Sequence, residues 1–361
     1  MTAGSETHAA GEEFTPVELA LATRNHGLPL EALRYDVTPV GLHYLLAHFD
    51  IPFVDESSWR LTVGGHVRNE ISLGLDELKD RPRVTLACTL ECAGNGRARL
   101  SPRPISQPWF EEAVGTAEWT GTPLRPLLEK AGIEDGAVEV VFTGLDRGLQ
   151  GGVEHRYERS LPLEEALHPE MLLAYEVNGQ PLPPQHGFPL RLIVPGWYGM
   201  THVKWLDRIT VVTEAFQGYQ QAAQYRQKQS EDDPGEPVTR MLPRSLLIPP
   251  GIPDFPQRQR FLEAEPCTLE GRAWSGWAPI ARVEVSVDGG GSWEDAELGE
   301  AVGEFGWSRW SFDWEDVQPG EYVLCSRATD GAGNVQPVEP EWNYLGHGNN
   351  PVQRVAVTVR D

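Results

Sequence analysis

Residues 83–97, RVTLACTLECAGNGR, decide how the rest of this chain is interpreted. The stretch begins with the two-residue alternation typical of a strand, and its apolar face is Val84, Leu86, Cys88 and Leu90. It ends in CAGNGR, where the glycines permit positive φ angles and leave backbone N–H groups unshielded. Cys92 thus ends a strand beside a glycine loop and Arg97, which suits a thiolate that binds a metal or attacks a substrate. The alternative is a small buried cysteine that precedes a turn.

Residues 89–97, TLECAGNGR, resemble the TLxCAGNxR segment of the sulfite oxidase family. Members of that family are molybdopterin-dependent oxidoreductases in which one protein cysteine binds the molybdenum. The resemblance therefore implies a Mo-molybdopterin cofactor with Cys92 as the metal ligand. It also implies that Arg97, five residues further along the chain, lines a pocket for an oxyanion.

Three later segments, AYEVNGQPLP (174–183), HGFPLR (186–191) and HVKWL (202–206), are similar to further motifs of the family. The resemblance implies that the pterin is bound by His186 and Arg191, by Lys204 and by the turn at His202 and Val203. Buried phosphate and ring carbonyls need fixed cations and N–H donors, which these residue types supply. A lone lysine among apolar residues more often extends to water, but the neighbouring arginine and glycines favour the ligand interpretation.

The anion-binding arginine of the family is missing from its usual place. The family segment TPxxxFYxRNHxPxP matches TP at residues 38–39 and HYLLAHFDIP at residues 43–52. This alignment puts Leu46 in the arginine position and keeps His48 at the family histidine, which implies a cofactor contact. Arg24 begins an upstream copy of the letters RNH. It either folds back to supply the missing charge or is a surface residue at a helix end.

Three further residues are implied as site residues by resemblance. Trp109 falls where the family has a tryptophan that walls the pocket. Asp146 belongs to a GLD segment that lies near the pterin in the family, and its alternative role is that of a turn residue. Tyr225 lies 21 residues after Lys204, at the family spacing for an active-site tyrosine, with Tyr219 as its competitor. A phenol there can donate a hydrogen bond to a substrate oxygen and gate access.

Composition limits the partners. The chain has 361 residues, enough for two or three domains, and a formal net charge of −23. That charge argues against nucleic-acid and anionic-membrane partners, but not against an anion in a locally basic pocket. The four cysteines match no zinc site and are too few for a disulfide scaffold. The chain shows no export signal and no apolar run of ~20 residues, so we expect a cytoplasmic protein.

The sequence predicts an α+β protein. We expect a disordered tail (residues 1–14), a mixed α/β molybdopterin domain (15–228), a proline-rich linker (229–261) and an immunoglobulin-like sandwich (262–361). The sandwich is predicted from short alternating strands with turn signals such as DGGG at residues 288–291. It resembles the family's dimerisation domain, which implies a homodimer. In animal members that domain adds a pocket arginine, for which no equivalent can be placed here.

The function implied by the resemblance is oxidation of sulfite to sulfate. Electrons are expected to pass to an external acceptor, a cytochrome or oxygen, because no Cys-x-x-Cys-His motif or cytochrome domain indicates haem in the chain. The missing arginine leaves open another oxyanion as substrate, or reduction of nitrate or a sulfoxide. The alternative from a different class is a non-catalytic binding module, which would contain no stoichiometric molybdenum.

Overall fold

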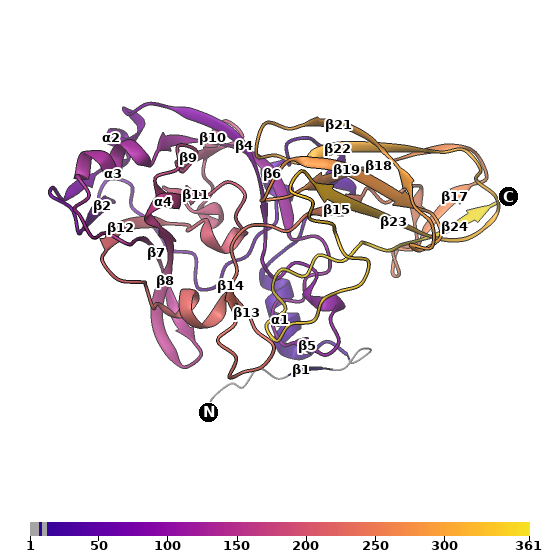
Figure 1. Ribbon diagram of the computed structural model, residues 1–361, viewed down its shortest axis with the longest axis horizontal. Helices are drawn as coiled ribbons and strands as arrows, with labels where there is room; N and C mark the ends of the chain where they lie inside the picture. The colour runs from indigo at the N-terminus through magenta and orange to yellow at the C-terminus, as the bar shows by residue number, and fades with distance from the viewer. Residues whose placement is uncertain (1–6, 9–12) are drawn as a thin grey trace.

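A computed structural model describes residues 7–8 and 13–361, which form two parts of unequal composition (Figure 1). The first part combines two sheets with short helices, and the second consists of strands and loops. The predicted α+β class is therefore confirmed. Most of the tail predicted to be disordered lies outside the described residues. Its Thr7–His8 forms the two-residue strand β1, which pairs with β5 (Arg103–Pro104).

Two five-stranded sheets build the first part. One has the order β10-β9-β6-β4, with β11 also on β9; its strands are β4 (Val84–Glu91), β6 (Val114–Pro123), β9 (Leu172–Val177), β10 (Gln180–Pro181) and β11 (Arg191–Ile193). The other has the order β3-β2-β12-β7-β8; its strands are β2 (Leu61–Gly65), β3 (Ile71–Leu73), β7 (Glu139–Gln150), β8 (Val153–Pro162) and β12 (Leu206–Val212). Only β2 and β12 pair in parallel within these two sheets. The predicted strand before Cys92 is thus β4.

Helices of the first part are short. The α-helices are α1 (Pro16–Arg24), α2 (Leu75–Lys79), α3 (Arg125–Ala131) and α4 (Leu163–Ala166). Single turns of 3-10 helix cover Leu30–Arg34, Val40–Leu42, Arg97–Arg99, Pro184–His186 and Gly199–Thr201, and a π-helical turn covers Gln220–Gln224. Thr15 caps α1 through a reciprocal hydrogen-bond pair with Glu18, as the Thr-Pro start predicts. Among the described residues, no helix is both long and apolar enough to cross a membrane.

The second part is a two-sheet sandwich, as predicted from its alternation. The first sheet has the order β15-β18-β22-β21; its strands are β15 (Arg244–Leu247), β18 (Cys267–Trp274), β21 (Glu297–Ala301) and β22 (Ser308–Trp314). The second has the order β16-β17-β24-β23-β19-β20; its strands are β16 (Ile252–Pro253), β17 (Arg260–Glu263), β19 (Ile280–Ser286), β20 (Glu294–Asp295), β23 (Gly320–Asp330) and β24 (Val355–Arg360). A buried aliphatic and tryptophan cluster fills the space between them.

The segment predicted as a linker over residues 229–261 differs from that prediction. It contains β14 (Glu236–Pro237), which pairs with β13 (Arg226–Gln227), and also β15, which pairs with β18 inside the sandwich. All four residues of β15 are buried. The prolines that suggested a linker flank β15 or belong to the two-residue edge strands β14 and β16, because proline is tolerated at sheet edges but not inside a central strand.

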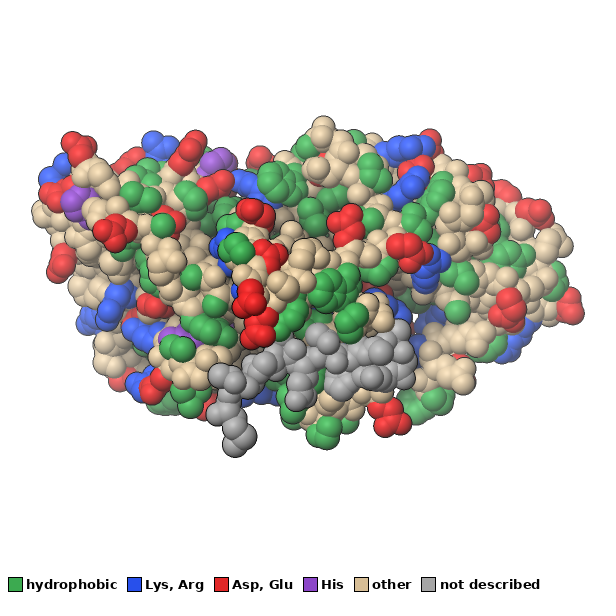
Figure 2. All heavy atoms as spheres, turned by 60° about the horizontal axis from the view of Figure 1, so that its bottom comes forward, with side chains coloured by type: hydrophobic (Ala, Val, Ile, Leu, Met, Phe, Trp, Pro, Cys, Tyr) green, Lys and Arg blue, Asp and Glu red, His purple; other side chains and the backbone are tan. Residues whose placement is uncertain are grey.

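The two parts pack together as a continuous core along β4, which stands between them in Figure 1. The backbone N–H of Thr89 donates to the carbonyl of Phe305 at 2.9 Å, so a loop of the sandwich covers the open edge of β4. Trp274 and Trp307 of the sandwich belong to the same buried cluster as the apolar residues of the first part. On the face shown in Figure 2, acidic and basic side chains are interspersed with apolar ones.

Replacement of Trp307 tests whether this interface stabilises the whole chain. The side chain is fully buried and its indole N–H donates to the carbonyl of Asp36 at 2.9 Å. We expect Trp307→Ala to lower the free energy of unfolding by about 3–5 kcal/mol, because it opens a cavity and orphans that carbonyl. Chemical denaturation measures the change. Phe255→Ala, at a side chain that is 88% exposed in the same domain, is the control and should change stability little.

Candidate active site

The loop after β4 is built around Cys92 and Asn95. The N–H of Cys92 donates to the carbonyl of Ala113 at 2.9 Å, and its carbonyl accepts from the N–H of Asn95 at 2.9 Å. The Asn95 side chain in turn accepts from the N–H of Ala113 at 3.0 Å. At Gly94 a Cβ would lie 2.7 Å from the Arg97 guanidinium, so glycine is required for Arg97 to fold back over the loop.

The Cys92 thiol is buried, with 6% of the residue exposed, and it lines a pocket between the two sheets of the first part. Burial raises the pKa of Cys92, and Arg97, the Gly94 N–H and the Trp109 indole oppose that rise. The Trp109 N–H forms no full hydrogen bond, but it lies close enough to the sulfur to favour the thiolate. A metal binds the thiolate, so binding would require loss of this proton, which the three opposing groups favour.

Arg97 is buried beside Cys92, but it lies behind the residues that line the pocket, as Trp109 does, so its contact with an oxyanion stays a prediction. Its Nε donates to the carbonyl of Leu345 at 3.1 Å and one terminal nitrogen donates to Ser106 Oγ at 3.0 Å. Leu345 belongs to the second part of the chain, so the sandwich helps to orient this guanidinium. Among the described residues, no carboxylate forms an ion pair with Arg97.

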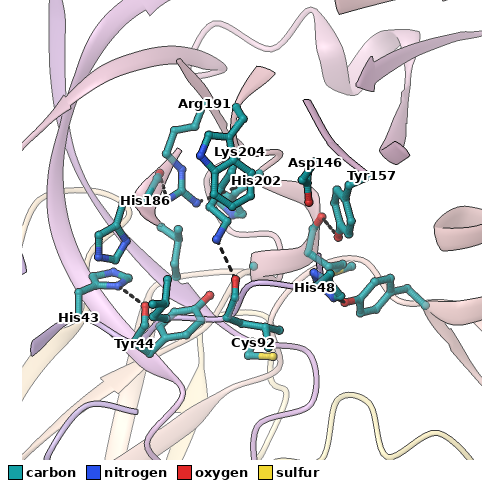
Figure 3. Close-up of a pocket in the computed structure, with 17 residues that line it drawn as sticks. His43, Tyr44, His48, Cys92, Asp146, Tyr157, His186, Arg191, His202 and Lys204 are labelled. Atoms are coloured by element: carbon teal, nitrogen blue, oxygen red, sulfur yellow. Dashed lines mark hydrogen bonds between the residues drawn. The ribbon is translucent and has the colours of Figure 1, made fainter. Parts of the chain in front are cut away.

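A basic wall of the pocket comes from His186, Arg191 and Lys204, which Figure 3 shows together on one side, with Cys92 at the base. Arg191 donates to the carbonyl of His186 at 3.1 Å and lies over the Trp119 ring at 4.6 Å. Its Nε has no hydrogen-bond partner, and burial lowers its pKa to about 10. The structure thus brings together the three side chains that the motifs predicted for the pterin.

Lys204 and Asp146 face the same pocket and influence each other. The Lys204 ammonium donates to the carbonyls of Leu46 at 2.8 Å and Gln185 at 3.1 Å. Burial lowers the pKa of Lys204, Arg191 lowers it further, and Asp146 partly offsets this. Burial raises the pKa of Asp146 and Lys204 opposes that rise. Asp146 is therefore a buried pocket residue and not merely part of a turn.

His202 and Val203 are buried in the turn that leads to Lys204. His202 Nδ1 accepts from the N–H of Val194 at 3.2 Å and its Nε2 contacts the carbonyl of Trp197 at 3.1 Å. Both ring nitrogens are therefore occupied by the protein. A contact of this turn with a cofactor would therefore be made by its backbone, and this stays a prediction.

His48 and Tyr225 meet at the other side of the pocket. His48 Nε2 lies 2.6 Å from the Tyr225 hydroxyl, and both residues line the pocket. Burial lowers the pKa of His48 to about 3, so its imidazole is neutral at physiological pH. Burial also raises the pKa of Tyr225, which keeps its phenol protonated. Its competitor Tyr219 stacks on His155 and does not line this pocket.

Arg24 and Leu46 show how the site differs from the predicted pattern. Leu46 lines the pocket and packs against Cys92 and Trp109, so an apolar side chain occupies the place of the expected arginine. Arg24 is half exposed, donates to the carbonyl of Phe49 and faces the Asp50 carboxylate at 3.5 Å. It does not line the pocket in this structure, although it lies near enough to Lys204 to lower the pKa of that ammonium. Its entry into the site stays a prediction.

Several site residues were missed by the sequence reasoning. His43, Tyr44 and Tyr157 line the pocket, and His43 packs edge-on against His186 with ring centroids 5.7 Å apart. The His43-Tyr44 pair stood inside the aligned segment, so its adjacency to the motif was a usable signal. The other two missed residues, Arg159 and His347, contact Tyr225. Arg159 and His347 lie on a strand and a loop far from any recognised motif. No sequence pattern therefore marked them as site residues.

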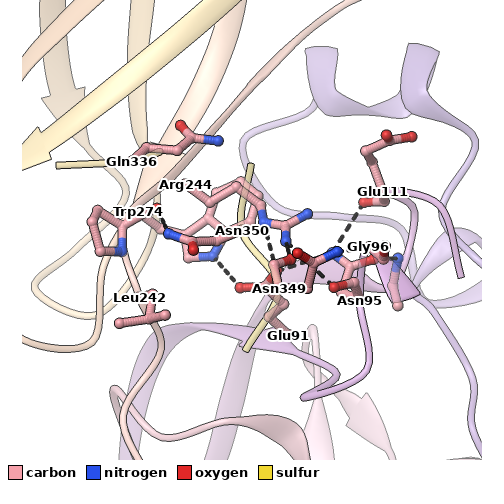
Figure 4. Close-up of polar contacts among 12 residues, drawn as sticks. Glu91, Asn95, Gly96, Glu111, Leu242, Arg244, Trp274, Gln336, Asn349 and Asn350 are labelled. Carbon is pink, nitrogen blue, oxygen red and sulfur yellow. Dashed lines mark hydrogen bonds and ion pairs between the residues drawn. The ribbon is translucent and has the colours of Figure 1, made fainter. Parts of the chain in front are cut away.

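The Cys92 loop is joined to the sandwich through the buried carboxylate of Glu91 (Figure 4). Glu91 lies 2.9 Å from Nε of Arg244 as an ion pair, with both side chains at most 2% exposed. Its other oxygen accepts from the Trp274 indole at 2.9 Å, and it also accepts from the Asn95 amide at 3.0 Å. Arg244 further donates to the carbonyl of Asn349. One carboxylate therefore connects β4, the Cys92 loop and the sandwich.

Positive charge at this site exceeds negative charge, because Asp146 is the one carboxylate among the described residues that line the pocket. Arg97, Arg159 and Arg191 are buried and Lys204 is partly buried, and none of the four forms an ion pair among the described residues. Burying an unpaired charge is costly, so such a set is stabilised by anions that bind from outside the chain. This donor set, with unpartnered nitrogens at Arg191 and His43 and a single thiol, fits a phosphate-bearing pterin with one cysteine ligand to its metal.

Comparison with protein-family models assigns both parts of the chain. Residues 48–220 match the oxidoreductase molybdopterin binding domain, and residues 254–360 match the Mo-co oxidoreductase dimerisation domain. The fold and pocket thus belong to a molybdopterin-binding oxidoreductase class.

Individual proteins that are similar to this chain support the same family assignment. The mitochondrial sulfite oxidase of Mus musculus is 36% identical over 340 residues, which cover 90% of this chain and 62% of that protein. An NADH nitrate reductase of Arabidopsis thaliana is 33% identical over 366 residues, which cover 93% of this chain and 40% of that protein. The crystal structure of the sulfane dehydrogenase SoxCD from Paracoccus pantotrophus superposes with a TM-score of 0.81 at 26% identity, covering 99% of this chain and 91% of that chain.

The chain belongs to the sulfite oxidase family of molybdopterin-dependent oxidoreductases. It spans about 62% of the length of the sulfite oxidases that it matches. The family resemblance recognised in the Cys92 segment is confirmed, and its particular residue roles remain predictions.

Replacement of Glu91 tests the connection between the Cys92 loop and the sandwich. Glu91→Gln keeps the shape but leaves Arg244 as a buried, uncompensated charge, so we expect unfolding free energy to fall by about 3–5 kcal/mol. Urea denaturation measures the change. The control is Glu176→Gln, which breaks the more exposed pair with Arg83 at 2.6 Å and should cost less than about 1 kcal/mol. If the two variants lowered the free energy of unfolding equally, the buried Glu91–Arg244 pair would not be the stabilising connection.

Proposed function

We propose that this chain oxidises sulfite to sulfate at a molybdenum cofactor bound through Cys92. The observation that carries the proposal is a set of buried or partly buried cations that form no ion pair in the described part of the chain. Arg191 and Lys204 line the pocket, and Arg97 and Arg159 lie behind it. Both a pterin phosphate and sulfite are anions that such a set favours. The relatives named sulfite oxidase at 35–36% identity support this substrate over others.

The overall reaction balances with water and an electron acceptor. Sulfite gains one oxygen atom that derives from water, and two protons and two electrons are released. A bound molybdenum cofactor would supply the two-electron redox change and the oxygen-atom transfer. The protein then has to hold the cofactor, bind the oxyanion and exclude water.

The position of each residue indicates whether it would bind the pterin or the metal. His186, Arg191 and Lys204 would bind the phosphate and ring of the pterin, together with the backbone of the turn at His202. Cys92 would bind the metal, and the neighbouring Arg97 favours its thiolate.

On the substrate side, Arg97 attracts the oxyanion, and the phenol of Tyr225 donates a hydrogen bond to a substrate oxygen. Trp109 and Leu46 pack against Cys92 and exclude water from its sulfur. This side contains fewer guanidinium groups than the family pattern, because Leu46 replaces an arginine.

We further propose that the chain works as a homodimer and passes electrons to an external acceptor, a cytochrome or oxygen. The match of residues 254–360 to a dimerisation domain supports the dimer. Reduction of nitrate is a second candidate. It is favoured by the apolar Leu46 in the pocket, because a monoanion requires less positive charge than sulfite, and by relatives named nitrate reductase.

Steady-state kinetics of molybdenum-replete protein decide between these candidates. We expect ferricyanide to be reduced at a rate that depends on sulfite, two ferricyanide ions per sulfite consumed. Nitrate with a reduced viologen dye should give a rate at least tenfold lower. A protein with full molybdenum that shows no sulfite-dependent rate would overturn the proposal, and a dominant nitrate rate would establish the second candidate.

The Cys92→Ser variant tests the role of the thiolate. We expect sulfite-dependent turnover to be lost while the pterin remains bound, because the pterin is held chiefly by Arg191, Lys204 and their neighbours. Pterin content is measured by fluorescence after oxidative release. Cys267→Ser, at a half-buried cysteine in the sandwich, is the control and should keep both pterin and turnover. Loss of pterin together with turnover would count against this division of roles.

A further inference from the structure

Tyr225 is held on three sides by residues that come from distant parts of the chain. Its hydroxyl lies 2.6 Å from His48 Nε2. The Arg159 guanidinium lies 5.4 Å from the centre of its ring, and the His347 imidazole is tilted by 31° with ring centroids 5.0 Å apart. His48, Arg159 and His347 are together called the Tyr225 clamp below. All three come from outside the segment that contains Tyr225.

Arg159 also fixes the backbone that leads to Tyr225. It lies on β8, is 1% exposed, and donates to the carbonyl of Gln220 at 2.6 Å. The same carbonyl accepts from the N–H of Tyr225 at 3.2 Å, which closes the π-helical turn. An arginine without a carboxylate partner is an expensive way to hold a turn. Its position over an aromatic ring offsets part of that cost through a cation–π contact.

His347 reaches Tyr225 from the sandwich. Its loop, residues 343–350, is anchored on the Cys92 loop, because the N–H of Gly348 donates to the carbonyl of Ala93 at 2.8 Å and the Asn349 amide donates to the carbonyl of Gly96 at 2.7 Å. The imidazole is 1% exposed, and its Nδ1 has no hydrogen-bond partner. A histidine buried with an unpartnered nitrogen costs stability, so a packing role alone would be served better by an apolar ring.

We propose that Arg159 and His347 are positioning residues for Tyr225, and that His347 makes the sandwich a direct contributor to the reaction of the first domain. The role rests on the proposed function, because it assumes that the Tyr225 hydroxyl meets the substrate. The clamp prevents the phenol from leaving the pocket while His48 fixes the position of its oxygen. A displacement of about 1 Å at such a hydroxyl is enough to cost up to about 100-fold in rate.

A double-mutant cycle tests whether His347 acts through Tyr225. We expect His347→Phe, which keeps an aromatic ring but removes both nitrogens, to lower kcat for sulfite about tenfold with little change in KM. In a Tyr225→Phe background the same substitution should have no further effect. His347→Gln, which removes the stacked ring instead, gives a second variant should the first fold poorly. His168→Phe, at an exposed histidine, is the control and should leave kcat unchanged.

The NMR signal of the Tyr225 ring carbon tests the Tyr225 clamp independently of enzyme activity. In protein labelled with ¹³C at the tyrosine Cζ, the Tyr225 signal is identified among nine by its loss in Tyr225→Phe. We expect this signal to shift in His347→Phe and in Arg159→Met, to be largely restored in Arg159→Lys, and to stay in place in His168→Phe.

The two measurements separate the clamp from the proposed function. An unmoved Tyr225 signal, or kinetic losses that multiply in the double variant, would overturn the clamp. A holoenzyme that oxidises no sulfite would overturn the proposed function, and the Tyr225 signal alone would then decide the clamp.

Discussion

The structure depends on one buried carboxylate, that of Glu91, at the point where β4 becomes the Cys92 loop. It contacts a guanidinium and an indole of the sandwich and an amide of the loop at the same time. Because a buried carboxylate requires all its partners, the loop can keep its shape only while the sandwich is in place. The position of the candidate metal ligand is therefore a property of both domains and not of the first domain alone.

The pocket carries a second constraint, which is an excess of buried positive charge. Glu91 neutralises Arg244, but Arg97, Arg159 and Arg191 form no ion pair within residues 7–8 and 13–361, and Lys204 is only partly offset by Asp146. Burial already lowers the pKa of Arg191 and Lys204, which shows how poorly the protein alone solvates them. A site with this electrostatic strain is completed by anions. Burial lowers the pKa of His43 and His48, and the neighbouring cations lower it further, so these pocket imidazoles are neutral.

Much of the site could be predicted because its residues lie in contiguous motifs. Cys92, His186, Arg191 and Lys204 each stand in a short segment whose glycines and prolines impose the local backbone, and the structure brings these residues to one pocket. The strand β4 followed from its alternation. The prediction failed to find β15, since a four-residue strand between prolines carries almost no periodic signal. It also left Arg24 undecided, and the structure pairs that residue with Asp50 at the surface.

The sequence by itself determined the class of fold, the family and the candidate pterin-binding residues that line one pocket, because each of these depends on local patterns in short segments. Only the tertiary structure decided what surrounds Tyr225 and what holds Cys92. Arg159 and His347 are 188 positions apart in the chain, and both contact Tyr225. Arg244 and Trp274 come from the sandwich and contact Glu91 of the first part. Contacts between the two domains leave no local pattern in the sequence. Burial, charge pairing and ring contacts between domains arise only when the two surfaces pack together.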